Sequence, residues 1–219
     1  MTYASVRAAI VIPALNESAT IGLVVAAVAP HGTPVVVDDG SSDATGSEAR
    51  ANGAVVVRHE SNRGYDAALQ SGFREADRLG AEFVVTFDAD GQHSPAVLRE
   101  FLAPLETGAA DLVLGVRPRA ARFAEHVFNG YVRLRFGVPD ILCGLKGYRM
   151  SLYHRHGRFD GTRSIGTELA IAGLNMQVPY RLVPVPIFER KAGTARLGST
   201  LRANLRILSA LMRAVVGKR

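Results

Sequence analysis

The chain has 219 residues, of which 47% are hydrophobic and 21% charged, so it is a globular protein of one-domain size and not a disordered chain. Its single cysteine, Cys143, excludes an internal disulfide and a cysteine-based zinc site. The net charge of +6 is unevenly divided, since residues 1–115 carry 7 Lys/Arg against 15 Asp/Glu and residues 116–219 carry 19 against 5.

The basic second half suits a polyanionic partner, such as an anionic membrane surface or a phosphate-bearing substrate. The sequence shows no zinc-finger spacing, helix-turn-helix signature or aromatic-rich RNA motif, so we expect no nucleic-acid partner. No apolar run approaches about 18 residues, and a strand begins close to the first residue, so we expect neither a transmembrane helix nor a signal peptide. These features predict a cytoplasmic location. Peripheral attachment to the inner face of the membrane is compatible with this prediction.

In the first half of the chain, short apolar runs alternate with helical patterns. The runs predict strands at 8–12, 34–37, 54–58, 83–87 and 111–115, and the patterns between them predict helices at 17–28, 43–52, 65–79 and 95–105. Short apolar strands separated by helices indicate an α/β fold with a mostly parallel sheet flanked by helices. Ligands of such sheets bind beyond the carboxyl ends of the strands.

The second half is less regular. We expect helices at 120–136 and 167–174 and an extended segment at 182–188, which Pro184 and Pro186 confine to a sheet edge or a loop. Because no repeat or linker interrupts the chain, residues 1–198 are expected to form one domain.

The tail, 199–219, is expected to be an amphipathic helix of that same domain. Its apolar stripe consists of Leu201, Leu205, Leu208, Met212 and Val215. Its polar stripe consists of Arg202, Arg206, Ser209 and Arg213. Such a helix either packs on the domain or lies in a membrane interface, with leucines in lipid and arginines among headgroups.

Polar side chains gather where three predicted strands end, at Asn16-Glu17, Asp38-Asp39 and Asp88-x-Asp90. Two carboxylates one residue apart at a strand end can approach one cation. Oxygen ligands beside a phosphate-bearing substrate suit Mg²⁺ or Mn²⁺. Gln92 and His93 add two further candidate ligands.

Four motifs resemble those of family-two glycosyltransferases and occur in the same order. They are Val11-Ile-Pro-Ala-Leu-Asn-Glu17, Val36-Val-Asp-Asp-Gly-Ser-Ser-Asp43, Asn62-Arg-Gly-Tyr65 and Asp88-Ala-Asp-Gly-Gln-His93. Within that family, the chain looks most like dolichol-phosphate mannose synthases and polyprenyl-phosphate glycosyltransferases. That likeness lies in Gly115-x-Arg117, Asn129, Asp140-x-x-Cys-Gly-x-Lys146 and Arg190-x-x-Gly193. The resemblance covers about residues 8–198 and implies a GT-A (Rossmann-like) fold and a nucleoside-diphosphate sugar donor.

The resemblance also implies a nucleotide site at the first strand ends. Exposed amides in the loop from Pro13 through Asn16 would face the nucleotide, since such a loop turns from a strand into a helix. Asp39 resembles the aspartate that binds the base, and Glu17 would lie near the base or ribose. Gly64 would let the backbone pass close to the nucleotide.

The same resemblance implies which residues bind the metal ion and the phosphate groups. Asp90 with Gln92 would bind the Mg²⁺ or Mn²⁺ that bridges the diphosphate, and Asp88, of the same D-x-D pair, would contact the sugar or ribose. Arg117, Lys146 and Arg190 resemble phosphate-binding residues, because a guanidinium binds phosphate bidentately and an ammonium acts as a point charge. We expect Arg122, Arg133 and Arg135 to lie on a solvated helix face.

Three roles are open for Glu168. It could be a catalytic base for a hydroxyl acceptor, a residue that positions the acceptor, or a carboxylate placed at a helix start by the helix dipole. A phosphate monoester acceptor is already an anion and needs no base, so positioning and charge neutralisation would dominate.

The sequence therefore predicts a metal-dependent, inverting glycosyltransferase acting on a polyprenyl-phosphate acceptor, with an anionic membrane surface as a further partner. Two alternatives stay open. One is transfer to a soluble hydroxyl, such as that of a natural product or a polysaccharide intermediate, with Glu168 as base. The other is a non-catalytic nucleotide-sugar-binding subunit. One departure bears on the lipid acceptor, because Ala195 replaces the serine found near Arg190 in many relatives of this subgroup.

Overall fold

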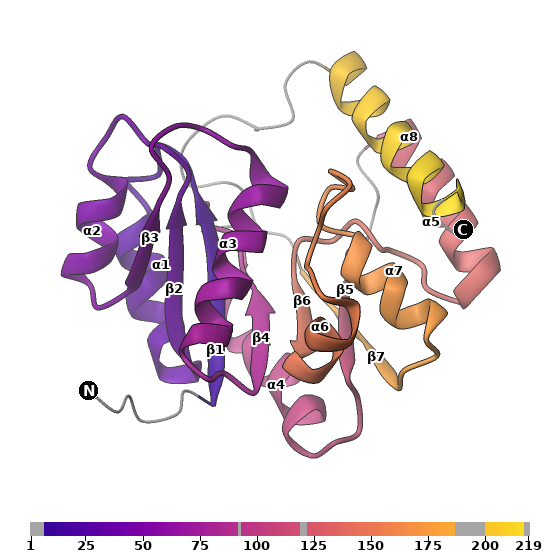
Figure 1. The fold of residues 1–219 in the computed structure, drawn as a ribbon, viewed down its shortest axis with the longest axis horizontal. Helices are drawn as coiled ribbons and strands as arrows, with labels where there is room; N and C mark the ends of the chain where they lie inside the picture. The colour runs from indigo at the N-terminus through magenta and orange to yellow at the C-terminus, as the bar shows by residue number, and fades with distance from the viewer. Residues whose placement is uncertain (1–6, 92, 119–121, 187–199, 217–219) are drawn as a thin grey trace.

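The computed structural model describes residues 7–91, 93–118, 122–186 and 200–216. It contains one seven-stranded sheet in the order β3-β2-β1-β4-β6-β5-β7 (Figure 1). The strands are β1 (Ala8–Ala14), β2 (Thr33–Asp38), β3 (Val55–Arg58), β4 (Phe83–Thr86), β5 (Leu112–Val116), β6 (Lys146–Arg149) and β7 (Tyr180–Pro184). All pairings are parallel except those of β6, which runs antiparallel to both β4 and β5. The mostly parallel sheet predicted from the sequence is confirmed, and β7 with its proline is an edge strand.

Helices flank this sheet. They are α1 (Ile21–Val28), α2 (Thr45–Ala51), α3 (Tyr65–Arg78), α4 (Leu98–Glu106), α5 (Phe123–Phe136), α6 (Met150–His156), α7 (Glu168–Asn175) and α8 (Thr200–Val216), with short 3₁₀ turns at Ala29–His31 and Pro95–Val97. Helix α1 begins later than predicted, because the carbonyl of Glu17 accepts from the amides of Thr20 and Ile21 and closes a turn first. Neither β6 nor α6 was predicted.

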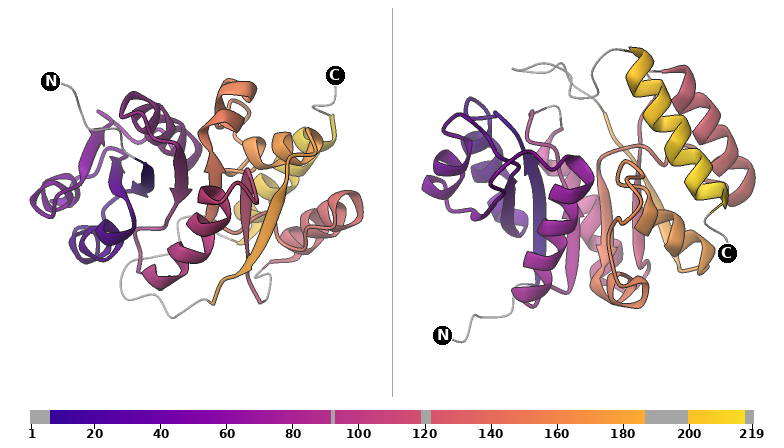
Figure 2. Two further views of the ribbon diagram at one scale, coloured as in Figure 1. Left: turned by 90° about the horizontal axis from the view of Figure 1, so that it is seen from below. Right: turned by 45° about the horizontal axis from the view of Figure 1, so that its top comes forward.

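Alternate residues of the strands supply two cores, one on each face of the sheet (Figure 2). In β1, Ala9 and Val11 belong to the core that includes residues of α3, α5, α6, α7 and α8, whereas Ile10 and Ile12 belong to the core that includes residues of α1, α2 and α4. Burial on both faces explains why β1 and β4 are apolar throughout and do not alternate.

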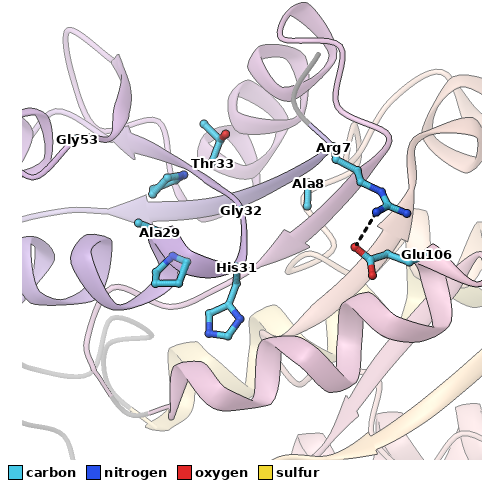
Figure 3. Close-up of a pocket in the computed structure, with 10 residues that line it drawn as sticks. Arg7, Ala8, Ala29, His31, Gly32, Thr33, Gly53 and Glu106 are labelled. Atoms are coloured by element: carbon cyan, nitrogen blue, oxygen red, sulfur yellow. Dashed lines mark ion pairs between the residues drawn. The ribbon is translucent and has the colours of Figure 1, made fainter. Parts of the chain in front are cut away.

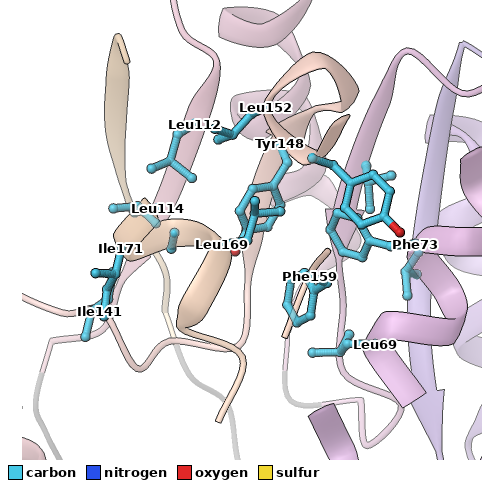
Figure 4. Close-up of a cluster of buried hydrophobic side chains, with 14 of the residues drawn as sticks. Leu69, Phe73, Leu112, Leu114, Ile141, Tyr148, Leu152, Phe159, Leu169 and Ile171 are labelled. Atoms are coloured by element: carbon cyan, nitrogen blue, oxygen red, sulfur yellow. The ribbon is translucent and has the colours of Figure 1, made fainter. Parts of the chain in front are cut away.

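Aromatic side chains form the centre of the first core (Figure 4). The ring of Phe73, on α3, stacks on Phe159 with centroids 4.5 Å apart and meets Tyr148, on β6, edge-on at 5.4 Å. Phe159 belongs to the segment after α6, so these contacts fix that segment against α3.

Helix α8 packs beside α5, and the amide of Ala124 donates to Asn204 Oδ1. The buried residues of α8 are the small or branched Ala203, Ile207 and Ala210, which allow a close approach. Leu205 and Met212, from the predicted apolar stripe, are instead 59% and 60% exposed. The helix therefore has a second apolar face, which is exposed among the residues that the structure describes.

Candidate active site

The loops after β1 and β2 are joined by hydrogen bonds at the carboxyl edge of the sheet. The Asn16 amide donates to Ser41 Oγ (3.0 Å), and Asn16 Oδ1 accepts from the Ser42 amide (2.9 Å). The Glu17 amide donates to Thr45 Oγ1 (2.8 Å). Asn16 adopts a left-handed φ of 52°, which asparagine tolerates better than most residues. The structure thus brings Asn16 and Glu17 together with the second strand end, as expected, and Pro13 lies beneath them in β1.

Asp39 holds the neighbouring loop. Its buried carboxylate accepts from the amides of Arg63 (2.9 Å) and Gly64 (2.8 Å), and His59 Nδ1 lies 2.6 Å away. Gly64 has a φ of 93°, a conformation that favours glycine, and precedes the first turn of α3. A carboxylate has about four acceptor positions, so these bonds leave room for a ligand donor as well.

Asp88 and Asp90 follow β4 at the same edge. Asp90 is buried, and the Asp88 side chain is 31% exposed, with His93 Nε2 3.2 Å from its Oδ2. A Cβ at Gly144 would lie 2.8 Å from Asp88 Oδ2, so the backbone of the segment before β6 passes directly against this carboxylate.

Oxygen donors of this kind fit Mg²⁺ or Mn²⁺. Among the described residues, no three His, Cys, Asp or Glu side chains gather as a metal-binding group. Two carboxylates suffice for such an ion only where substrate phosphates or water complete its ligands. Gln92, the third expected ligand, lies outside the described residues.

Lys146 lies at the start of β6 and is buried. Its Nζ donates to the carbonyl of Cys143 (2.6 Å), and its amide donates to Thr86 Oγ1 (3.1 Å). Burial lowers the pKa of Lys146, an effect that the charges of Asp140 and Asp88 oppose. One ammonium hydrogen is therefore committed to the protein, and two remain for a phosphate.

Arg117, also expected to bind phosphate, is held by two carboxylates. It donates to Asp140 from Nε (2.7 Å) and Nη2 (3.0 Å), and to Glu125 from Nη2 (3.1 Å). Asn129 Nδ2 donates to Asp140 as well, and Arg122 donates to Glu125. The two arginines and two carboxylates cancel in formal charge, so Arg117 adds less positive potential than the sequence indicates.

Glu168 begins α7 and is the centre of another network. Oε1 accepts from Arg158 Nε (2.6 Å) and lies 3.2 Å from His156 Nε2, whereas Oε2 accepts from the amides of Gly161 (2.8 Å) and Thr162 (3.0 Å). Burial alone would raise the pKa of Glu168, but these hydrogen bonds outweigh it and lower the pKa to about 2. A carboxylate with so low a pKa is a weak proton acceptor.

Two carboxylates near the site were not singled out from the sequence. Asp66, in the first turn of α3, accepts from the Gly166 amide (2.6 Å), and burial together with the charge of Asp160 raises its pKa to about 6. Asp160 accepts from the amide of Ser164 (3.0 Å). Asp66 directly follows the Asn62–Tyr65 motif, so its position was a usable signal, whereas nothing in the sequence pointed to Asp160.

The other candidate arginines differ in position. Arg133 and Arg135 are exposed on α5, as expected, whereas Arg122 is paired with Glu125 at 3.2 Å. Arg190 lies outside the described residues.

A shallow hollow of about 530 Å³ lies at the opposite edge of the sheet, beside the amino ends of β1 and β2 (Figure 3). It is lined by Ala8, His31 and Thr33, and an ion pair of 3.9 Å joins Arg7 to Glu106 beside it. It contains none of the candidate side chains, and ligands of parallel sheets bind at the other edge.

Comparison with known proteins identifies the family of the chain. The family model "Glycosyl transferase family 2" matches residues 9–157. An uncharacterised protein of Methanocaldococcus jannaschii is 38% identical over 64% of this chain, a match that spans only 63% of that protein's length. Polyprenol monophosphomannose synthase of Mycolicibacterium smegmatis is 30% identical over 90% of this chain and 83% of its own.

Among solved structures, glucosyl-3-phosphoglycerate synthase of Mycobacterium tuberculosis, in complex with Mn²⁺ and UDP-glucose, superposes with a TM-score of 0.74. It is 26% identical, and the alignment covers 96% of this chain and 80% of that one. The expected GT-A fold is thereby confirmed. The chain belongs to glycosyl transferase family 2 and is a glycosyltransferase.

Proposed function

We propose that the protein transfers a sugar, with inversion, from a nucleoside-diphosphate sugar to a polyprenyl phosphate, with the help of Mg²⁺ or Mn²⁺. The observation that carries the donor half is the gathering of Glu17, Asp39, Asp88 and Asp90 at one edge of the sheet. Support comes from the similar synthase of M. tuberculosis, which binds Mn²⁺ and UDP-glucose.

In this proposal each carboxylate has a separate task. Asp39 accepts from the base while it holds the 63–64 backbone, and Glu17 lies toward the base or ribose. Asp90 would hold the ion and Asp88 would lie toward the sugar or ribose, and the ion would supply positive charge to the departing diphosphate. The ammonium of Lys146, on the neighbouring strand β6, would add positive charge for the same diphosphate.

The state of Glu168 favours a phosphate acceptor over a hydroxyl. A hydroxyl needs a base to take its proton, and the carboxylate of Glu168, with a pKa of about 2, is poorly suited to that task. A phosphate monoester carries its own negative charge and can attack the sugar carbon directly. The similar synthase of M. smegmatis is named for a polyprenol monophosphate product, which agrees with this choice.

Helices α5 and α8 lie side by side (Figures 1 and 2). Their exposed side chains suit a lipid surface. Both carry exposed large apolar residues and exposed arginines: Phe123, Val127, Leu134, Leu205, Met212 and Val215, with Arg133, Arg135 and Arg206. Apolar side chains flanked by arginines favour an anionic membrane interface, where a polyprenyl phosphate resides. No helix among the described residues is long and apolar enough to cross a membrane.

Thermal unfolding with a panel of UDP-, GDP-, dTDP- and CDP-sugars, each with and without Mn²⁺, tests the donor half. A donor that binds the native state raises the melting temperature by mass action. We expect one donor to do so only with Mn²⁺, and Asp90→Ala to abolish the shift, whereas Asp77→Ala, an exposed carboxylate on α3, should retain it. A panel without any shift would refute the donor site.

Transfer assays with that donor then compare a prenyl phosphate with the corresponding prenyl alcohol. We expect product only from the phosphate. Glu168→Gln should lower the rate of transfer but leave its pH dependence unchanged, because no catalytic base has been removed. Transfer to the alcohol, lost in Glu168→Gln, would replace the phosphate acceptor with a hydroxyl acceptor.

A further inference from the structure

The segment between α6 and α7, residues 157–167, is held on two sides. On one side, α3 accepts from it: Gln70 Oε1 from the Phe159 amide (2.7 Å) and Asp66 Oδ1 from the Gly166 amide (2.6 Å). On the other side, Arg213 of α8 donates from Nη1 to the carbonyls of Thr162 and Arg163, the second at 2.8 Å. A segment close to the candidate site is thus fastened to a helix that lies about fifty residues further along the chain.

Thr162 connects that fastening to Glu168. Its carbonyl accepts from Arg213, and its amide and Oγ1 donate to Glu168 Oε2 at 3.0 and 2.8 Å. The Gly161 amide adds a third bond to the same oxygen, at 2.8 Å. Three of the donors that fix Glu168 therefore belong to Gly161 and Thr162, and Thr162 is itself bound by Arg213.

The backbone of this segment needs such support. Arg163 has a φ of 57° and the β-branched Ile165 a φ of 56°. Left-handed conformations of non-glycine residues cost about 1–2 kcal/mol each and persist only where surrounding contacts hold them. Arg213 binds the carbonyl of Arg163, Asp66 binds the amide of Gly166, and Asp160 binds the amide and hydroxyl of Ser164 between them.

We infer that Arg213 is a positioning residue for glycosyl transfer: by binding the Thr162 and Arg163 carbonyls, it fixes the segment that orients Glu168 toward the acceptor. This role rests on the proposed function, because it places Glu168 on the acceptor side. The planar guanidinium suits the task, since its N–H groups can serve two neighbouring carbonyls at once.

Arg206 provides a matched control. It is an exposed arginine on the same helix, seven residues earlier, so it projects from nearly the same side of α8. If the arginines of α8 act only through their charge, Arg206→Ala and Arg213→Ala should have the same effects.

Hydrogen exchange on the purified full chain tests the contact without any substrate. We expect the amides of 161–167 to exchange faster in Arg213→Ala, at a wild-type rate in Arg206→Ala, and at an intermediate rate in Arg213→Lys, whose ammonium can still reach a carbonyl. Unchanged exchange in Arg213→Ala would overturn the inference, whatever the enzyme's substrates prove to be.

Steady-state kinetics with a short, water-soluble prenyl phosphate then test the consequence. Arg213→Ala should lower kcat over the acceptor KM by about tenfold, because small displacements of a positioning group are costly, while the donor KM and the melting temperature stay near wild type. Partial rescue by Arg213→Lys is expected. Equal losses in Arg206→Ala, or a loss confined to the donor KM, would overturn the inference.

The two proposals fail differently. A wild-type protein that transfers nothing to any prenyl phosphate refutes the proposed acceptor, and the exchange comparison still decides whether Arg213 orders the segment. A wild-type protein that transfers normally, with Arg213→Ala unchanged in both measurements, refutes only the role of Arg213.

Discussion

Two regions of this protein are held together differently: the proposed donor edge, formed by the loops after β1 and β2, and the networks around Arg117 and Glu168, called here the proposed acceptor side. At the donor edge, short polar side chains bind backbone amides, as Asn16 does with Ser42 and Asp39 does with Gly64. On the acceptor side, carboxylates bind arginines as well as amides, as Asp140 does with Arg117 and Glu168 does with Arg158.

Because of this difference, the net charge of a segment does not equal the charge that it offers to a ligand. In the acidic first half, the carboxylate of Asp39 binds backbone amides of a loop. In the basic second half, Arg117 and Arg158 form ion pairs with carboxylates. Net charge summed over a segment therefore overstates the charge available to a ligand. The uncompensated positive surface is better sought among exposed arginines such as Arg133 and Arg206 than at Arg117.

The largest effect is expected where a buried ion pair is broken. Burial would raise the pKa of Asp140, but hydrogen bonds and charge from Arg117 outweigh it and lower that pKa. Asp140→Ala would leave a mostly buried guanidinium with Glu125 alone and should cost about 3–5 kcal/mol in the free energy of unfolding, measured in urea. Asp77→Ala, which breaks an exposed contact with His154, should cost less than about 1 kcal/mol. Equal costs would mean that the acceptor side does not depend on its ion pairs.

A smaller loss is expected at the donor edge. In Asp39→Asn one oxygen is kept and the other becomes an NH₂ group, which faces the amide of either Arg63, bound by Oδ1, or Gly64, bound by Oδ2. The loss of charge-assisted hydrogen bonds should cost about 2 kcal/mol of stability. Denaturant unfolding should show this loss, and Glu60→Gln, an exposed acid of the same loop, should show almost none. A neutral Asp39→Asn would indicate that the carboxylate serves the ligand alone.

The sequence located the polar residues of the donor edge because each lies in a short motif at a strand end, although their hydrogen bonds join residues 24 to 28 positions apart. Strand ends, the Asn16-Glu17 turn and Gly64 all carry local signals in composition and spacing. The same reasoning located Asp88 and Asp90 at a strand end, and the structure places them there.

The acceptor side could not be predicted in the same way. Strand β6 has four residues, Lys-Gly-Tyr-Arg, without apolar alternation, and it is a strand because β4 and β5 pair with it on both sides. Arg117 and Asp140 were each noted in the sequence, but nothing in the sequence showed that the carboxylate of Asp140 would bind the guanidinium of Arg117. The sequence also did not show which face of α8 packs on the domain. Ala203, Ile207 and Ala210 are buried, whereas the larger Leu205 and Met212 are exposed.

The smallest effect expected is at Asp66, which lies between the two regions, and it depends on pH. The pKa of Asp66 in the folded state, about 6, exceeds the ordinary value of 3.8 for an aspartate, so between these values the folded state binds more protons than the unfolded state. Stability therefore falls as pH rises from about 4 to 6, by no more than about 3 kcal/mol, and remains reduced above pH 6. Lys146 attracts the ionised carboxylate, whereas Asp160 repels it.

Asp66→Asn should remove this pH dependence while Asn Oδ1 still accepts from the Gly166 amide. We expect the variant to be more stable than wild type by about 1–2 kcal/mol at pH 8, and no more stable than wild type at pH 4.5, in urea unfolding at both values. A variant that is less stable at pH 8 would show that the ionised Asp66 is itself a structural anion of the acceptor side, as Asp140 is. The boundary between the two kinds of interaction would then lie on α3 and not beyond it.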